Sequence, residues 1–248
     1  MAEIIPGAEP MSAEGGPVGV LVLHGFTGNP QSMRPLAEAI AKAGHGVEMP
    51  LLSGHGTAIE DMLDTTWADW SADAETAYEQ LAARSERVVV AGLSMGGSLT
   101  CWLATRHPGI AGIVCVNPAT RAAAEVRDFI QGMVDGGEEI MPGIGSDVKK
   151  EGVVELAYPG TPLRPLLSMF DAANELDGAF ARISCPVLLF TSPEDHVVPP
   201  SDSDFLAESV SGPVTRVSLD NSYHVATIDN DAELIAERTL QFIDEVTA

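Results

Sequence analysis

The stretch Arg87-Val-Val-Val-Ala-Gly-Leu-Ser94-Met-Gly-Gly97 leads a run of β-branched residues into a serine flanked by glycines. Its pattern predicts a buried strand over Arg87–Ala91 and a helix over Met95–Thr105, with Ser94 in the turn between them. A turn this tight forces its central residue into a strained backbone conformation, and small neighbours prevent a clash. The motif G-x-S-x-G in this context predicts a serine that projects at a helix N-terminus, where backbone N–H groups favour negative charge.

On both sides of this turn, short apolar runs alternate with longer helical patterns. Further strands are expected at Val18–Leu23, Gly46–Met49, Ile110–Val116, Val187–Thr191 and Thr215–Leu219. Further helices are expected at Pro30–Lys42, with Asn29 as its cap, at Trp67–Ala83 and at Ala232–Glu245. Strands that are apolar throughout and separated by helices indicate a mostly parallel sheet covered on both faces. The predicted fold class is therefore α/β.

The segment from Thr120 to Pro165 interrupts this alternation. It is rich in glycine and proline, and it shows no convincing strand. Apolar residues at i, i+3, i+4 and i+7 predict one face of a short helix, formed by Val126, Phe129, Ile130 and Met133. An ordinary helix with loops packed on the core would give the same pattern. Long excursions in compact domains are often lids, however, so we expect an inserted cap with its apolar face over a pocket.

Composition limits the classes of function. Of the 248 residues, 45% are hydrophobic, which is enough to bury a large core and excludes disorder over the whole chain. Lys plus Arg number 13 against 36 Asp plus Glu, so the formal net charge is −23. Such a surface repels phosphate backbones and anionic lipid. We therefore expect no nucleic-acid partner and a small neutral substrate.

Cysteine usage and targeting signals point to an ordinary soluble chain. Cys101, Cys115 and Cys185 lie in or beside apolar runs, and their odd number without a CxxC pair argues against a disulfide framework or a zinc site. No HExxH or similar spacing occurs, so we expect no metal and no cofactor. The chain shows neither a signal-peptide pattern nor an apolar run of membrane-spanning length. We expect a cytoplasmic protein without a stable membrane anchor.

A serine nucleophile needs a base, and the base needs a partner that fixes its tautomer. In folds built around this turn, the chain order is serine, then acid, then histidine. Asp195 follows one predicted strand and His224 follows the next, so both lie at the sheet edge that carries Ser94. The order of these residues along the chain and their place at one edge of the sheet together predict Asp195 as the acid and His224 as the base. Glu194 is the nearest rival acid, and His196 is too close to Asp195 in sequence to be its partner.

The negative charge that develops on a substrate oxygen requires N–H donors aimed at it. One donor should be the backbone N–H of Met95, the residue after the nucleophile. The other should come from the loop Leu23-His-Gly-Phe-Thr-Gly28, where Phe26 is the expected donor. His24 precedes Ser94 in the chain, so we assign it a structural hydrogen-bonding role.

These residues resemble the α/β-hydrolase family over almost the whole chain. The matching segments are His24–Gly28, Gly92–Gly97, Glu194–Pro199 and Ser222–Thr227. More narrowly, the chain is similar to bacterial carboxylesterases and monoacylglycerol lipases that have a small cap. The segments that carry this second likeness are Pro6–Pro10, Gly54–Gly56 and Thr66–Trp70.

The resemblance implies an α/β-hydrolase fold with a mostly parallel sheet of about six to seven strands, helices on both faces and a small cap inserted after the sixth strand. The hydrolase core would comprise residues 1–119 and 185–248, and the cap with a return helix would comprise 120–184. Glu155 matches a cap glutamate that holds the glycerol hydroxyls in the similar lipases. Ile144 would line the pocket wall.

The expected function is the hydrolysis of carboxylic esters, above all monoacylglycerols, through an acyl-enzyme. The apolar cap side chains that suit an acyl chain are Phe129, Ile130, Met133, Met141 and Ile144. The same cap would make transient contact with a lipid interface. A general short-chain carboxylesterase and an acyltransferase on the same scaffold are the alternatives. A non-catalytic protein is disfavoured because no member of the triad is missing.

Overall fold

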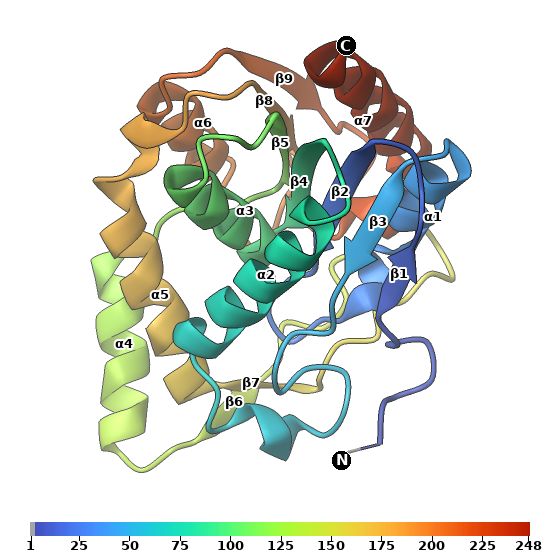
Figure 1. Cartoon of the computed structure of the whole chain (residues 1–248). Helices are drawn as coiled ribbons and strands as arrows, with labels where there is room; N and C mark the ends of the chain where they lie inside the picture. The colour runs from blue at the N-terminus through green and yellow to red at the C-terminus, as the bar shows by residue number, and fades with distance from the viewer. Residues whose placement is uncertain (1–2) are drawn as a thin grey trace.

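The computed structural model describes residues 3–248 and contains a seven-stranded sheet with the order β1-β3-β2-β4-β5-β8-β9 (Figure 1). All neighbouring strands are parallel except β1 and β3. The strands are β1 Met11–Ala13, β2 Val18–Leu23, β3 Gly46–Met49, β4 Arg87–Leu93, β5 Gly112–Val116, β8 Val187–Thr191 and β9 Val214–Ser218. The strand that leads to Ser94 therefore lies in the middle of the sheet.

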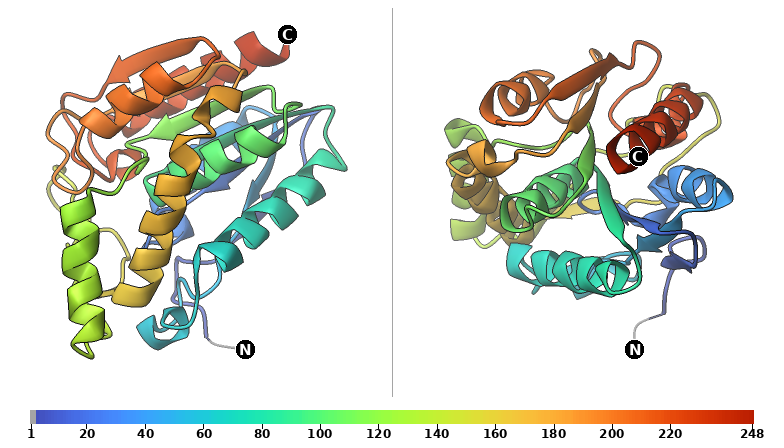
Figure 2. Two further views of the ribbon diagram at one scale, coloured as in Figure 1. Left: turned by 90° about the vertical axis from the view of Figure 1, so that its left-hand side faces the viewer. Right: turned by 45° about the horizontal axis from the view of Figure 1, so that its top comes forward.

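Helices cover both faces of the sheet, as the sequence predicts (Figure 2). The α-helices are α1 Arg34–Lys42, α2 Trp67–Ala82, α3 Met95–Arg106, α4 Ala124–Asp135, α5 Leu163–Asp177, α6 Ser201–Ser209 and α7 Ala232–Thr247. Alternate residues of β4 enter two separate cores: Val88 and Val90 pack with α2 and α3, whereas Val89 and Ala91 pack with α1 and α7. This alternation explains why the strand is apolar throughout.

The segment of residues 120–184, here called the insertion, lies between β5 and β8 and contains α4 and α5. Helices α4 and α5 lie side by side (Figure 1). The expectation of no strand here is wrong, because β6 Ile140–Pro142 pairs antiparallel with β7 Gly160–Pro162. Each of these strands has only three residues and includes a proline, so neither shows a strand pattern in the sequence. The insertion follows the fifth strand along this chain rather than a sixth, because only one short strand precedes β2.

Several element boundaries differ from the sequence expectation. The helix expected from Pro30 begins as a 3₁₀ turn over Pro30–Ser32, and Asn29 caps that turn by accepting from the N–H of Gln31 at 3.0 Å. The sequence pattern does not predict strand β1 or helix α6. Strand β1 has three residues, and α6 is mostly polar, so neither carries enough periodic apolar positions to be recognised. Within residues 3–248, no helix is both long and apolar enough to cross a bilayer.

Candidate active site

Ser94 lies between the end of β4 and the start of α3 with φ 54° and ψ −118°. For a residue with a side chain this conformation costs about 1–3 kcal/mol, and such strain clusters at functional sites. Glycines make the turn feasible. A Cβ on Gly92 would lie 2.1 Å from the carbonyl oxygen of Gly96, and a Cβ on Gly96 would lie 2.2 Å from that of Leu23. The glycines of the motif are therefore required by close backbone contacts.

His224 and Asp195 meet at the same edge of the sheet as Ser94. Nδ1 of His224 lies 2.7 Å from Oδ2 of Asp195, and their side chains are only 7% and 2% exposed. The other carboxylate oxygen of Asp195 accepts from the N–H groups of Val197 and Val198, both at 2.8 Å. The aspartate is thus held from both sides. Its bond to Nδ1 leaves Nε2 of His224 free to accept a proton.

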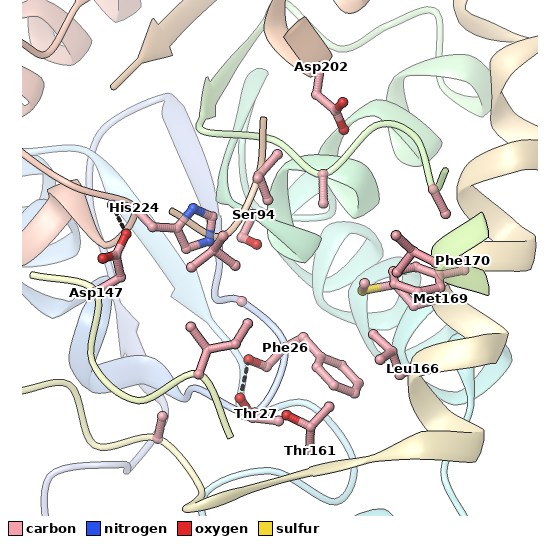
Figure 3. A pocket seen from close by; sticks show the side chains of 18 of the residues that line it. Phe26, Thr27, Ser94, Asp147, Thr161, Leu166, Met169, Phe170, Asp202 and His224 are labelled. Atoms are coloured by element: carbon pink, nitrogen blue, oxygen red, sulfur yellow. Dashed lines mark hydrogen bonds between the residues drawn. The ribbon is translucent and has the colours of Figure 1, made fainter. Parts of the chain in front are cut away.

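Ser94 and His224 line one cavity (Figure 3). The side-chain hydrogen bonds of residues 3–248 include none from the Ser94 hydroxyl, and catalytic hydrogen bonds are often long in unliganded enzymes. The rival acid Glu194 does not approach the histidine. Its carboxylate is 58% exposed and lies 3.1 Å from Nζ of Lys149. The geometry therefore favours Asp195 over Glu194 as the partner of His224.

Asn117 is a further residue of the site that sequence reasoning missed. It follows β5 with φ 43° and is buried. Its amide donates to the carbonyl of His224 at 2.8 Å and to Oγ of Ser192 at 3.0 Å, and its oxygen accepts from the N–H of Ser192 at 2.8 Å. Asn117 thereby ties the loop after β8 to the loop that carries His224. Its position directly after a predicted strand, at the edge shared with Ser94, was the available signal.

The structure places the loop of Phe26, one of the expected N–H donors, beside Ser94, and Met95, the other, directly follows Ser94 at the start of α3. Phe26 and Ser94 line the same cavity, and the position of a Cβ on Gly25 would be 3.4 Å from Cβ of Ser94. Within the described chain, neither the N–H of Phe26 nor that of Met95 is used in a hydrogen bond to another residue. Oγ1 of Thr27 donates to the carbonyl of Phe26 at 2.7 Å, which fixes the orientation of the loop (Figure 3). Two free donors beside the nucleophile are the arrangement that stabilises a developing oxyanion.

His24 has the structural role expected for it. Nδ1 lies 3.0 Å from the carbonyl of Gly25, and Nε2 accepts from the N–H of Leu52 at 3.2 Å. Burial lowers the pKa of His24 to about 4, so the ring is neutral at pH 7. Its edge packs against His55 at a ring distance of 5.0 Å, and His55 in turn packs against Trp70 at 5.6 Å. These rings support the loop that presents Phe26.

The cavity beside Ser94 has a volume of about 720 Å³. Four of the expected substrate-binding residues line it: Ile130, Met141, Ile144 and Glu155. Phe129 and Met133 do not. Phe129 is 66% exposed, and Met133 packs on the core. In α4 the inward positions follow a four-residue spacing through Val126 and Ile130, and Phe129 lies about 100° around the helix from Ile130.

Helix α5 supplies the part of the apolar wall that the sequence did not indicate. Leu166, Met169 and Phe170 all line the cavity, and Figure 3 shows their side chains gathered on one side of it. These residues belong to a helix whose amphipathic pattern is that of any helix packed on a core. Nothing in that pattern distinguishes a face that covers other side chains from a face that covers a cavity.

Comparison with known proteins gives the family of the chain. The family model described as serine aminopeptidase, S33, matches residues 18–231. A thermostable monoacylglycerol lipase of Bacillus sp. (strain H-257) is 50% identical over 242 residues, which cover 96% of this chain and 95% of the relative. The chain belongs to this family of α/β-hydrolases. The hydrolase is also 24% identical to a carboxylesterase of Bacillus subtilis (strain 168) over 240 residues, 96% of this chain and 97% of that one.

Solved structures give the same family and fold for the hydrolase. A structure from work on LipS and LipT, two metagenome-derived lipolytic enzymes, superimposes with a TM-score of 0.94 at 44% identity and covers 98% of this chain and 100% of that one. A monoacylglycerol lipase of Paleococcus ferrophilus has a TM-score of 0.78 at 19% identity, with 96% and 100% covered. The second likeness concerns the fold alone. The expected fold and family are confirmed.

Among residues 3–248, Glu155 is the one glutamate that lines the cavity. Its N–H donates to Oγ of Ser146 at 2.9 Å, and Oε1 lies so close to Gly28 that a Cβ there would be 2.7 Å away. Burial raises the pKa of Glu155 to about 7, against the opposing effects of the His224 charge and a hydrogen bond with Ser32. No ion pair to a cation compensates this carboxylate within residues 3–248. It is therefore available to polar groups of a ligand.

The raised pKa of Glu155 predicts a pH-dependent cost in stability. The folded-state pKa lies above the ordinary 4.5, so folding favours the protonated carboxyl. The free energy of unfolding therefore falls as the pH rises from 4.5 to about 7. Glu155→Gln should therefore stabilise the hydrolase at pH 8, by on the order of 1–3 kcal/mol, and have little effect at pH 5. Thermal unfolding at both pH values measures this. The exposed Glu151→Gln is the control, and an equal shift of Tm at both pH values would contradict the assignment.

Proposed function

We propose that the protein hydrolyses carboxylic esters and that monoacylglycerols are its preferred substrates, with Ser94 as nucleophile, His224 as base and Asp195 as acid. The observation that carries this proposal is the Asp195–His224 hydrogen bond of 2.7 Å at the wall of the cavity that Ser94 also lines. A mostly apolar lining that includes Glu155 suits a molecule with one fatty chain and one diol.

In the proposed reaction, Oγ of Ser94 forms a bond to the ester carbonyl carbon while Nε2 of His224 takes the hydroxyl proton. The carbonyl oxygen becomes an oxyanion that accepts hydrogen bonds from the N–H groups of Phe26 and Met95. The tetrahedral intermediate then expels the alcohol, which receives the proton from His224, and leaves an acyl-enzyme. Water then attacks the acyl carbon while His224 takes its proton. The bond between that carbon and Oγ of Ser94 breaks, Oγ receives the proton from His224, and the fatty acid leaves.

We propose that residues 120–184 act as a cap that binds the acyl chain, with 1–119 and 185–248 as the catalytic core. Ile130 and Met141 of the cap line the cavity together with residues of α5, and Ile144, which is 63% exposed, also lines it. A cavity of about 720 Å³ has the size that encloses one drug-sized ligand. One acyl chain with its glycerol matches that size, whereas a triacylglycerol carries two more chains that would have to lie outside it.

Glu155 is proposed to accept hydrogen bonds from the free hydroxyls of the glycerol group. Glu155→Ala should lower kcat/KM for monoacylglycerols at least tenfold, because a hydrogen bond to a charged group contributes about 1.5–3 kcal/mol, and should leave the hydrolysis of simple ethyl esters nearly unchanged. The ratio of kcat/KM for a monoacylglycerol and the ethyl ester of the same acid measures this selectivity. The exposed cap residue Glu151→Ala is the control. A ratio that stays constant in Glu155→Ala would refute the diol site.

Two alternatives on the same scaffold are separated by product analysis. A general short-chain carboxylesterase would prefer short simple esters over monoacylglycerols in a kinetic panel that also contains di- and triacylglycerols. An acyltransferase would form a new ester from an added alcohol faster than free acid. The proposal expects monoacylglycerols to give the highest kcat/KM of the panel and free fatty acid to be the main product at any alcohol concentration well below that of water.

The partner proposed beyond the substrate itself is the surface of an uncharged lipid aggregate, touched transiently through the cap. The insertion carries exposed apolar side chains, namely those of Val126, Phe129, Ile140, Ile144, Val154 and Leu156. A net charge of −23 would disfavour anionic bilayers and leave neutral monoacylglycerol aggregates as the matching surface. We propose that the reaction occurs in the cytoplasm, where the free thiols of Cys101, Cys115 and Cys185 would stay reduced.

A further inference from the structure

Asp147 belongs to the insertion, yet its polar atoms contact both the loop that carries Asp195 and the loop that carries His224. Oδ2 accepts from the N–H of His224 at 3.0 Å and from the N–H of His196 at 3.2 Å. Oδ1 lies 2.8 Å from Nδ1 of His196, and the backbone carbonyl of Asp147 accepts from the N–H of Val225 at 3.1 Å. The side chain is 12% exposed and lies beside His224 at the cavity wall (Figure 3).

These contacts complete the restraint of His224. Its carbonyl accepts from Asn117 of the core, and its N–H donates to Asp147 of the insertion. Both polar groups of the His224 backbone are therefore held, one from each part of the molecule. The N–H of His196, held by the same oxygen, directly follows Asp195 in the chain. One carboxylate oxygen thus links the residue after the acid with the base itself.

The neighbouring residues of the insertion are anchored to the same two loops. Asp229 accepts from the N–H groups of Lys149 and Lys150 at 2.7 and 2.8 Å, and also from the N–H of Tyr223 at 2.9 Å. Nζ of Lys149 lies 3.1 Å from Glu194. The stretch 147–150 is therefore fixed to the core at the base and acid loops. Asp147 differs from the other anchors because it alone binds the N–H of His224.

We infer that Asp147 is a positioning residue for the reaction: it sets the separation of the acid and base loops so that His224 reaches Asp195 and Ser94 together. This inference rests on the proposed triad. Its physical reason is that both residues lie on loops beyond the strand ends, where the sheet no longer fixes the backbone. A displacement of the imidazole by about 1 Å can lower turnover about a hundredfold. The cap consequently has a role in the chemical step in addition to substrate binding.

A positioning role through hydrogen bonds and a role for the negative charge of Asp147 predict different activities for Asp147→Asn. The single carbonyl oxygen of asparagine can accept from both N–H groups, and its amide can donate to Nδ1 of a neutral His196. All contacts to the two loops are then kept, so Asp147→Asn should stay within a few-fold of the native kcat. Asp147→Ala removes them and should lower kcat about a hundredfold. A role for the negative charge itself would make the two variants equally slow.

The test compares Asp147→Ala and Asp147→Asn with a matched control, Asp171→Asn. Asp171 lies on α5 and binds Nε of Arg127 of α4 at 2.6 Å, so its replacement also removes a carboxylate contact of the insertion, but one that lies within the insertion and does not touch the triad loops. Steady-state kinetics are measured with a monoacylglycerol and with a small acetate ester. The far-downfield proton resonance of the His224–Asp195 bond is recorded by NMR, and Tm confirms folding.

The inference predicts that Asp147→Ala lowers kcat for both esters by the same factor with little change in KM, and weakens or removes the downfield resonance. Asp147→Asn and Asp171→Asn should keep a nearly native kcat and the downfield resonance. If Asp147→Ala does not fold, Asp147→Ser takes its place, because a serine hydroxyl is too short to bridge the two N–H groups. A loss confined to KM for the monoacylglycerol would overturn the inference, as would equal losses in the alanine and asparagine variants or in Asp171→Asn.

Failure of the underlying triad would look different. In that case Ser94→Ala would keep its ester hydrolysis, and no downfield resonance would depend on Asp195. With the triad confirmed in the native protein, an Asp147→Ala variant of normal kcat and an unchanged resonance would refute the positioning role alone.

Discussion

Ser94→Ala is expected to lower kcat for ester hydrolysis by at least about ten-thousand-fold while the protein stays folded. The substitution removes the only atom proposed to bond to the substrate. It leaves Phe26, Met95 and the cavity in place, so a small residual rate from oxyanion stabilisation should remain. Stability should change little, because alanine at φ 54° carries a strain similar to that of serine.

Ser98→Ala is the matched control for this prediction. Ser98 lies one turn further along α3, and its buried hydroxyl donates to the carbonyl of Ala119. Its loss should cost about 1 kcal/mol of stability and leave kcat within a few-fold of the native value. Initial rates with a monoacylglycerol, together with Tm, measure both effects. Hydrolysis by Ser94→Ala at more than a hundredth of the native rate would refute Ser94 as the nucleophile.

The second large effect is expected for Asp195→Asn, about ten-thousand-fold in kcat. Oδ1 of Asp195 accepts from the N–H groups of Val197 and Val198, so the carbonyl oxygen of asparagine should occupy that place. The amide would then point at Nδ1 of His224 and donate to it. The imidazole would be forced to carry its proton on Nε2, the atom that must accept the proton of Ser94. The geometry of the site would survive while the base is in the wrong tautomer.

Glu194→Gln is the control for the acid, because Glu194 is adjacent in sequence, exposed and paired with Lys149. It should retain nearly all activity. Steady-state kinetics of both variants, with Tm to verify folding, decide between the two carboxylates. The assignment of the acid would fail if Asp195→Asn were fully active, or if Glu194→Gln were the variant that lost activity.

The parts of the site that the sequence predicts are those fixed by local geometry. Ser94 is recognisable because a strand, two close-packed glycines and a helix occur within eleven residues. Asp195 and His224 are recognisable because each follows a predicted strand, and parallel strands end at one edge. Phe26 follows from the same rule. The sheet and its two helical layers follow from strands that are apolar throughout.

The residues that sequence reasoning missed depend on contacts between distant segments. Asp147 lies in a glycine-flanked loop without periodicity, and only the fold brings it to His224, 77 positions away. The sequence predicts Phe129 in the pocket because a helical stripe shows which residues are apolar. The stripe does not fix which of two adjacent residues points inward, since neighbours differ by only about 100° around the helix axis. For the same reason α5 was not recognised as a cavity wall. The short strands β6 and β7 have too few residues to show alternation.

The central claim, that Ser94 is the nucleophile of a hydrolase with a monoacylglycerol site, is tested most directly by mapping the adduct of a long-chain alkyl fluorophosphonate. The reagent is titrated against the protein, and peptide mass spectrometry locates the label. We predict one adduct, on Ser94, with activity lost in proportion to labelling and with labelling slowed by a monoacylglycerol. Full labelling of Ser94 with hydrolysis intact, or inactivation through a label on another residue, would contradict the account.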